Sequence, residues 1–85
     1  MQVLVPSALR SYTGSDWVQA QGGNLAAVLA DLDDQFPGIR FRVVDEQGQV
    51  RRHIRFFHQG AALTSLDTPL NPDQPLHMVQ ALSGG

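Results

Sequence analysis

The sequence predicts a small two-layer α+β domain in which one amphipathic helix covers one face of a mixed β-sheet. Three observations support this fold class. An apolar stripe with helical spacing runs from Leu25 to Phe36, short segments with strand character lie on both sides of it, and the 85 residues suffice for one core. One helix on one sheet is a stable arrangement for a chain of this length. We therefore expect a single domain over residues 1–85.

The N-terminal segment predicts a β-hairpin. Val3-Leu4-Val5 is a β-branched and aliphatic run that ends at Pro6, and it predicts a strand that extends loosely toward Leu9. Residues 11–16 are rich in Ser, Gly and Asp, which favour a turn. Residues 17–20 then predict a second short strand. Two strands joined by a compact turn form an antiparallel hairpin.

The central helix is predicted to begin after Asn24, whose side-chain oxygen can accept a hydrogen bond from a free N–H of the first turn. Pro37-Gly38 ends it. Apolar residues at i, i+3, i+4, i+7 and i+11 form the stripe that we expect to pack on the sheet: Leu25, Val28, Leu29, Leu32 and Phe36. The acidic residues of the opposite face are expected to be solvated rather than to bind magnesium: Asp31, Asp33 and Asp34.

The second half of the chain predicts the rest of the sheet. The apolar side chains of residues 39–50 indicate a loop or short turn anchored on the core, which leads into a turn at 45–49. Residues 51–58 alternate in part and predict a strand with Ile54 and Phe56 on its inner face. The remaining predicted elements are a brief return strand at 61–63, a connector at 64–75 with one tight helical turn, and a last strand at 76–82 with Leu76 and Met78 in the core.

Composition limits the classes of function. A formal net charge of -2 argues against nucleic-acid binding through bulk positive charge. The absence of Cys leaves neither a disulfide framework nor a thiolate nucleophile. The opening residues are too short and uncharged for a signal peptide, and no apolar run reaches membrane-spanning length, so we expect a cytoplasmic protein without a membrane partner. All six basic residues are Arg, for which GC-rich coding and avoidance of reactive amines both stay open.

The sequence offers no catalytic constellation. His53, His58 and His77 lack metal-ligand spacing and no Cys joins them, so we expect no metal site. By strand parity, His58 falls on the core side and is expected to be structural. Residues 21–24 precede a helix but lack the lysine and the spacing of a phosphate-binding loop. We therefore expect a protein that is not an enzyme and that binds no cofactor itself.

The C-terminal residues carry the most distinctive pattern. Gly84 and Gly85 have no Cβ and can thread a channel too narrow for a side chain. The distinctive chemical group there is the terminal carboxylate of Gly85. We expect residues 83–85 to form an exposed tail that presents this carboxylate to another protein; a frayed terminus without function is the alternative.

These features together resemble the ubiquitin-like β-grasp fold, and within it the bacterial sulfur carriers. That family includes the small subunit of molybdopterin synthase, the thiamin-pathway carrier and the carrier of a thiocarboxylate-dependent cysteine synthase. The resemblance is carried by Val3-Leu4-Val5 with Leu9-Arg10 and Gly14, by Asn24-Leu25 and the helix that ends at Phe36-Pro37-Gly38-Ile39, and by Gly84-Gly85. Residues 45–48 before Arg51 resemble an insertion of the molybdopterin and cysteine-synthase carriers, which favours these two pathways over thiamin.

The resemblance implies that an E1-like adenylyltransferase uses ATP and magnesium to adenylate the carboxylate of Gly85. A sulfur donor then converts it to a thiocarboxylate, and a sulfur-accepting synthase receives the sulfur. Gly84 and Ser83 would thread the partner's active site. A ubiquitin-like modifier conjugated through Gly85, the small subunit of a synthase and a non-covalent β-grasp interaction module are the alternatives. The pathway, the cognate partners and the oligomeric state stay open.

Docking to these partners is expected to use the sheet face away from the helix. If Ile54 and Phe56 point inward, the alternate residues of their strand point outward, and the same parity applies to the last strand. An exposed aromatic side chain flanked by Arg is typical of an interface centre. The expected docking residues are Arg55, Phe57, His77, Val79 and Leu82.

Overall fold

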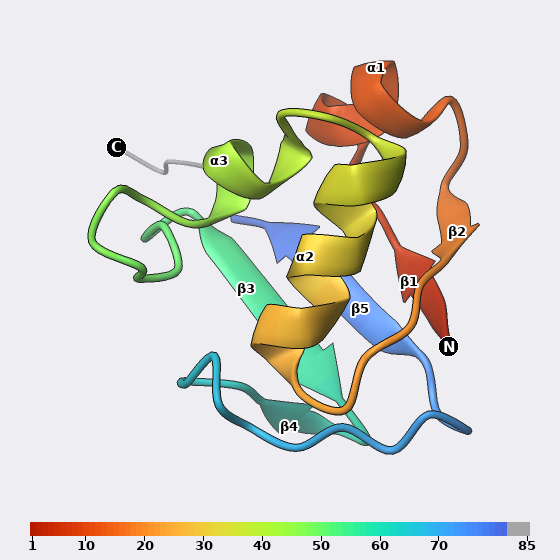
Figure 1. Cartoon of the computed structure of the whole chain (residues 1–85), viewed down its shortest axis with the longest axis vertical. Helices are drawn as coiled ribbons and strands as arrows, with labels where there is room; N and C mark the ends of the chain where they lie inside the picture. Colours follow the sequence, from red (N-terminus) through yellow and green to blue (C-terminus); the bar gives the residue numbers. More distant parts are fainter. Residues whose placement is uncertain (82–85) are drawn as a thin grey trace.

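The computed structural model describes residues 1–81 and shows a five-stranded mixed sheet with helices packed against one face (Figure 1). The strand order is β2-β1-β5-β3-β4, in which β1 and β5 run parallel and the other neighbours antiparallel. In chain order, the elements are β1 (Gln2–Leu4), η1 (Ser7–Leu9), α1 (Arg10–Thr13), β2 (Trp17–Gln19), α2 (Leu25–Gln35), α3 (Ile39–Val43), β3 (Ile54–His58), β4 (Ala61–Ala62) and β5 (Leu76–Gln80).

Helix α2 forms as predicted. The Asn24 side chain accepts a hydrogen bond from the N–H of Ala27 at 2.8 Å and caps the first turn. The stripe packs into the core, with Leu25, Val28, Leu29 and Leu32 at most 1% exposed and Phe36 half-buried. Burial of each of these aliphatic side chains contributes about 1.5–3 kcal/mol.

The segment before α2 approaches the helix closely at Gly22. A Cβ atom built on Gly22 would lie 2.6 Å from the backbone nitrogen of Val28. Only glycine fits such an approach of backbone to backbone. The neighbouring Gly23 has nothing within 4 Å of its would-be Cβ.

The hairpin of β1 and β2 is confirmed, but its connection differs from the prediction. Val3 pairs with Val18, as an antiparallel hairpin requires. Instead of an extended strand and a turn, residues 7–13 form the short helices η1 and α1. Gly14 closes them, because its positive φ of 71° lets its N–H donate to the carbonyl of Arg10 at 2.7 Å.

Helix α3 replaces the predicted loop, and an acidic residue of α2 explains why. The Asp33 carboxylate accepts hydrogen bonds from the N–H groups of Gly38 and Arg40, both at 3.1 Å, and so caps the first turn of α3. Asp31 accepts a bond from the N–H of Gln21 at 3.0 Å. The prediction of a solvated acidic face is therefore wrong for these two half-buried residues and right for the exposed Asp34.

The alternation predicted for the last two long strands is confirmed. Ile54 and Phe56 of β3 and Leu76 and Met78 of β5 are buried, at most 1% exposed. β3 is shorter than predicted because residues 51–53 form a turn, in which the N–H of Ile54 donates to the carbonyl of Arg51. β4 forms as expected. The connector at 64–75 contains turns but no helical turn, which corrects that prediction.

His58 is a buried structural residue, as predicted. Its Nε2 accepts a hydrogen bond from the N–H of Asn71 at 2.9 Å, so its Nδ1 donates to the carbonyl of Pro75 at 3.0 Å. The ring thus joins the end of β3 to the segment that leads into β5. In the part of the chain described, no helix has the length and apolar character needed to cross a membrane.

Candidate partner-docking face

The sheet face opposite α2, here called the outer face, carries a continuous row of residues across the sheet. Buried and outward side chains alternate along each strand, so cross-strand partners share a face. Leu4 of β1 pairs with both Trp17 and His77, and Phe57 of β3 pairs with both His77 and Ala62. The row therefore runs over all five strands in the order Trp17, Leu4, His77, Phe57, Ala62.

Two aromatic side chains of this row, those of Trp17 and His77, contact each other. The rings of Trp17 and His77 meet edge-on, with centroids 5.8 Å apart and planes at 68°. Such a contact contributes about 0.5–1.5 kcal/mol beyond area burial. Trp17 remains 43% exposed and Phe57 and His77 are half-buried, so this aromatic surface is open to a partner.

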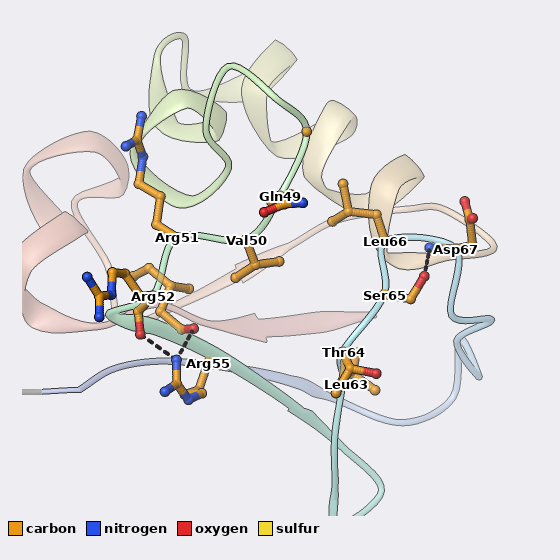
Figure 2. A pocket seen from close by; sticks show the side chains of 12 residues that line it. Gln49, Val50, Arg51, Arg52, Arg55, Leu63, Thr64, Ser65, Leu66 and Asp67 are labelled. Carbon is orange, nitrogen blue, oxygen red and sulfur yellow. Dashed lines mark hydrogen bonds between the residues drawn. The ribbon is translucent and has the colours of Figure 1, made fainter.

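A second pair on the outer face lies nearer the end of β5. Arg55 stands directly opposite Val79, which is 40% exposed. The guanidinium of Arg55 donates to the backbone carbonyls of Arg52 and Ile54, as the dashed lines in Figure 2 show. These bonds fix the side chain and leave its charge at the surface.

The structure thus brings together four of the five predicted docking residues. Arg55, Phe57, His77 and Val79 form two adjacent cross-strand pairs on the outer face. Their role in docking stays a prediction. Leu82, Ser83, Gly84 and Gly85 lie outside the described residues.

Sequence reasoning missed the β1 and β2 members of the row. The strand predicted at residues 17–20 includes no direction for the Trp17 side chain. A signal was present, because Val18 and Ala20 share one parity and Trp17 shares the other with Gln19. An aromatic residue on the polar side of a strand indicates an exposed position. Leu4 lacked such a signal, since its segment is apolar throughout.

The end of β5 has a well-defined position in the sheet. β5 lies between β1 and β3, so it has a hydrogen-bonded neighbour on each side. Gln80 pairs with Ile54, and the N–H of Ala81 then donates to the carbonyl of His53 at 2.7 Å. This position, here called the tail root, borders the outer face.

A hollow of about 660 Å³ lies between the segment 48–55 and the segment 63–67 (Figure 2). Arg51, Arg52 and Arg55 come from one side and Thr64 and Ser65 from the other. The Ser65 hydroxyl accepts a hydrogen bond from the N–H of Asp67 at 3.1 Å and so stabilises its own turn. Among the described residues that line the hollow, no hydroxyl is hydrogen-bonded to a base.

One acidic residue in the turn beside this hollow has a shifted pKa. The pKa of Asp45 lies below its usual value, mainly because the N–H of Gln49 donates a hydrogen bond to the carboxylate at 3.0 Å. Partial desolvation opposes this shift, while the N–H of Gln47 and the charge of Arg51 add to it. Asp45 therefore organises the turn at 45–49.

Comparison with known proteins identifies the fold. No protein-family model and no curated protein sequence matches the chain. Among solved structures, a chain of the Amycolatopsis orientalis BexX/CysO complex matches with a TM-score of 0.89 and 25% identity, over 99% of this chain and 98% of that one. CysO of Mycobacterium tuberculosis matches with a TM-score of 0.89 and 26% identity, over 95% of this chain and 98% of that one. SAMP1 of Haloferax volcanii matches with a TM-score of 0.78 and 24% identity, over 100% of this chain and 98% of that one.

The chain is therefore a ubiquitin-like β-grasp protein. Its structural neighbours are proteins of the sulfur-carrier type, so the resemblance inferred from the sequence is confirmed.

Proposed function

We propose that this protein is a sulfur carrier whose C-terminal Gly85 is converted to a thiocarboxylate. The main support is the match to two CysO structures at a TM-score of 0.89 over at least 95% of the chain. The sequence adds Gly84 and Gly85, three and four residues after Ala81, beyond a central strand that ends beside the Arg55–Val79 pair of the outer face. A carrier needs such an arrangement, with a reactive end beside a docking surface.

In the proposed reaction, the Gly85 carboxylate attacks the α-phosphorus of ATP in an E1-like adenylyltransferase, and pyrophosphate leaves. The resulting acyl-adenylate has a good leaving group. Hydrosulfide supplied by the donor then attacks the carbonyl carbon, AMP leaves, a proton is released, and the thiocarboxylate remains. Magnesium and the residues that bind ATP belong to the partner, so the carrier is a co-substrate rather than an enzyme. Because activation consumes ATP, the proposal places the reaction in the cytoplasm.

Two observations bear on the partners and the pathway. One matching structure is a complex of CysO with BexX, which supports a protein partner for this chain. The turn at 45–48 resembles the insertion in the molybdopterin and cysteine-synthase carriers, and the two structures described above with at least 25% identity contain CysO. We therefore favour a cysteine-type or molybdopterin-type pathway over thiamin.

A protein modifier joined to target lysines through Gly85 is the second candidate. The match to SAMP1, a small archaeal modifier protein, is below 25% identity and supports the fold alone. A modifier would form larger covalent conjugates in the cell that disappear when residues 84 and 85 are deleted. A non-covalent interaction module would keep its cellular function after that deletion.

ATP–pyrophosphate exchange tests the proposed function. The wild-type protein is incubated with the E1-like adenylyltransferase of its host, labelled pyrophosphate and ATP. We expect exchange that depends on the carrier and is lost in a variant ending at Ser83, because the carboxylate that accepts the adenylyl group has then moved back by two residues. Exchange that is equal with and without residues 84 and 85 would contradict the proposal.

A further inference from the structure

The basic residues of this acidic protein are concentrated in one region. The formal net charge is -2, yet five of the six arginines lie between residues 40 and 55. This stretch comprises α3, the turn at 45–49 and the start of β3, which lie on one side of the molecule (Figure 1). A local positive potential on a negative protein is a feature that a partner can recognise.

Four of these arginines lie near the tail root: Arg42, Arg51, Arg52 and Arg55. The N–H of Ala81 bonds the carbonyl of His53, between Arg52 and the start of β3, and Arg55 lies opposite Val79. The Nε of Arg51 donates to the carbonyl of Phe41 at 2.9 Å, and its guanidinium lies 4.9 Å from the centroid of the Phe41 ring. We define the tail-root patch as Phe41, Arg42, Arg51, Arg52, His53 and Arg55.

Contacts among residues 1–81 leave most of the positive charge of this patch without an ion pair. The ion pair found between residues 1 and 81 joins Arg10 to Asp16, and neither belongs to the patch. Arg51 is partly balanced by nearby Asp45, whose pKa it lowers. Arg42 and Arg52 are exposed, and within the described chain their side chains make no hydrogen bond. Their charges are available to a partner.

The patch also has the composition of an interface centre. Phe41 is 57% exposed and shares a shallow hollow with Arg42, Arg51 and His53. Aromatic residues and arginine are enriched in protein interfaces and among the residues that contribute most binding energy. An exposed Phe among arginines therefore fits a protein surface better than a free anion.

We propose that the tail-root patch docks on an acidic protein surface that surrounds the channel mouth of the activating partner, an inference that rests on the proposed function. Gly85 is the fourth residue after Ala81, and four residues span at most about 14 Å when extended. An enzyme that bonds to Gly85 must therefore cover the tail root, and its nearest surface faces the patch. Complementary charge there steers association and fixes the orientation of the tail.

The test is carrier-dependent ATP–pyrophosphate exchange by the host E1-like adenylyltransferase, measured against salt concentration. The double variant Arg42→Gln/Arg52→Gln removes two positive charges from the patch. The control Ala61→Glu/Gln74→Glu changes the net charge by the same amount at exposed positions near the other end of β5. Thermal melts confirm that both variants are folded.

We expect kcat/KM of the patch variant to fall about tenfold at low salt, with kcat unchanged, because steering acts on association. At about 0.5 M salt, screening should bring the variant within about twofold of the wild type. The control should follow the wild type at both salt concentrations. Equal kcat/KM for the patch variant and the wild type at low salt, or an equal fall in the control, would overturn the patch assignment and leave the proposed function intact. A wild-type protein that supports no exchange at all would overturn both.

Discussion

Trp17 on β2 meets His77 on β5 edge-on, with ring centroids 5.8 Å apart, although β1 lies between their strands. Leu4 on β1 pairs with both residues, and the two aromatic side chains meet over it. His77 in turn lies opposite Phe57 on β3. The contact therefore connects the hairpin to the strand that leads into the C-terminal tail and makes the outer face one continuous surface.

Removal of either large aromatic side chain from this row should weaken partner binding. We expect Trp17→Ala and Phe57→Ala each to cost about 1–2 kcal/mol of binding free energy to the activating partner, which corresponds to about a five- to thirtyfold rise in Kd. Titration calorimetry measures this change. Gln74→Ala, at an exposed position outside the row, should bind as the wild type does. Unchanged Kd values for both aromatic variants would remove the outer face from the docking surface.

The buried ring of His58 should stabilise the domain through its two hydrogen bonds. His58→Phe keeps an aromatic ring but leaves the N–H of Asn71 and the carbonyl of Pro75 without these partners. We expect the free energy of unfolding to fall by about 1–3 kcal/mol. Urea denaturation measures it, with the exposed His53→Phe as the control, for which the change should stay within about 0.5 kcal/mol. If His58→Phe and His53→Phe had the same free energy of unfolding, the buried ring would contribute through packing and not through its two hydrogen bonds.

The close approach at Gly22 gives a matched pair of substitutions. Gly22→Ala places a methyl group 2.6 Å from the nitrogen of Val28, so backbone must move, at an expected cost of about 1–3 kcal/mol. Gly23→Ala adds the same methyl group in open space and should change stability by less than about 0.5 kcal/mol. Thermal unfolding of both variants compares them. A smaller effect at Gly22 than at Gly23 would contradict the described packing of this loop on α2.

The lowered pKa of Asp45 predicts a specific pH dependence. The hydrogen bonds of the folded turn, first that from Gln49, stabilise the ionised carboxylate of Asp45 relative to the unfolded chain. Ionised Asp45 therefore stabilises the fold above its ordinary pKa of 3.8. That contribution is lost as the pH falls through the lower pKa of the folded state. Asp45→Asn keeps an oxygen acceptor and removes the charge, so it should be less stable than the wild type at neutral pH. The difference should shrink between about pH 5 and about pH 2; a constant difference over this range would contradict the assignment.

Apolar spacing, helix capping and strand alternation were enough to predict the elements that depend on residues close together in the sequence. The apolar stripe and Asn24 define α2, and the parity of residues 54–58 and 76–80 placed Arg55, Phe57, His77 and Val79 on one face. These features depend on period and capping, which a short window of sequence contains.

The features that the sequence did not reveal depend on contacts between distant residues. Helix α3 has β-branched and aromatic residues that favour other structures, and it forms where Asp33 of α2 caps it. The contact of Trp17 with His77 requires the strand order β2-β1-β5, which brings together residues 60 positions apart. The tail-root patch likewise gathers residues from α3, the following turn and β3.

The mass of the intact protein, purified after co-expression with the host adenylyltransferase and sulfur donor, tests the central claim most directly. The account predicts a species that exceeds the unmodified mass by the difference between a sulfur and an oxygen atom, and fragmentation should place the added sulfur on Gly85. The variant that ends at Ser83 should not acquire it. A wild-type protein that keeps its unmodified mass under these conditions, with an active adenylyltransferase, would contradict the account.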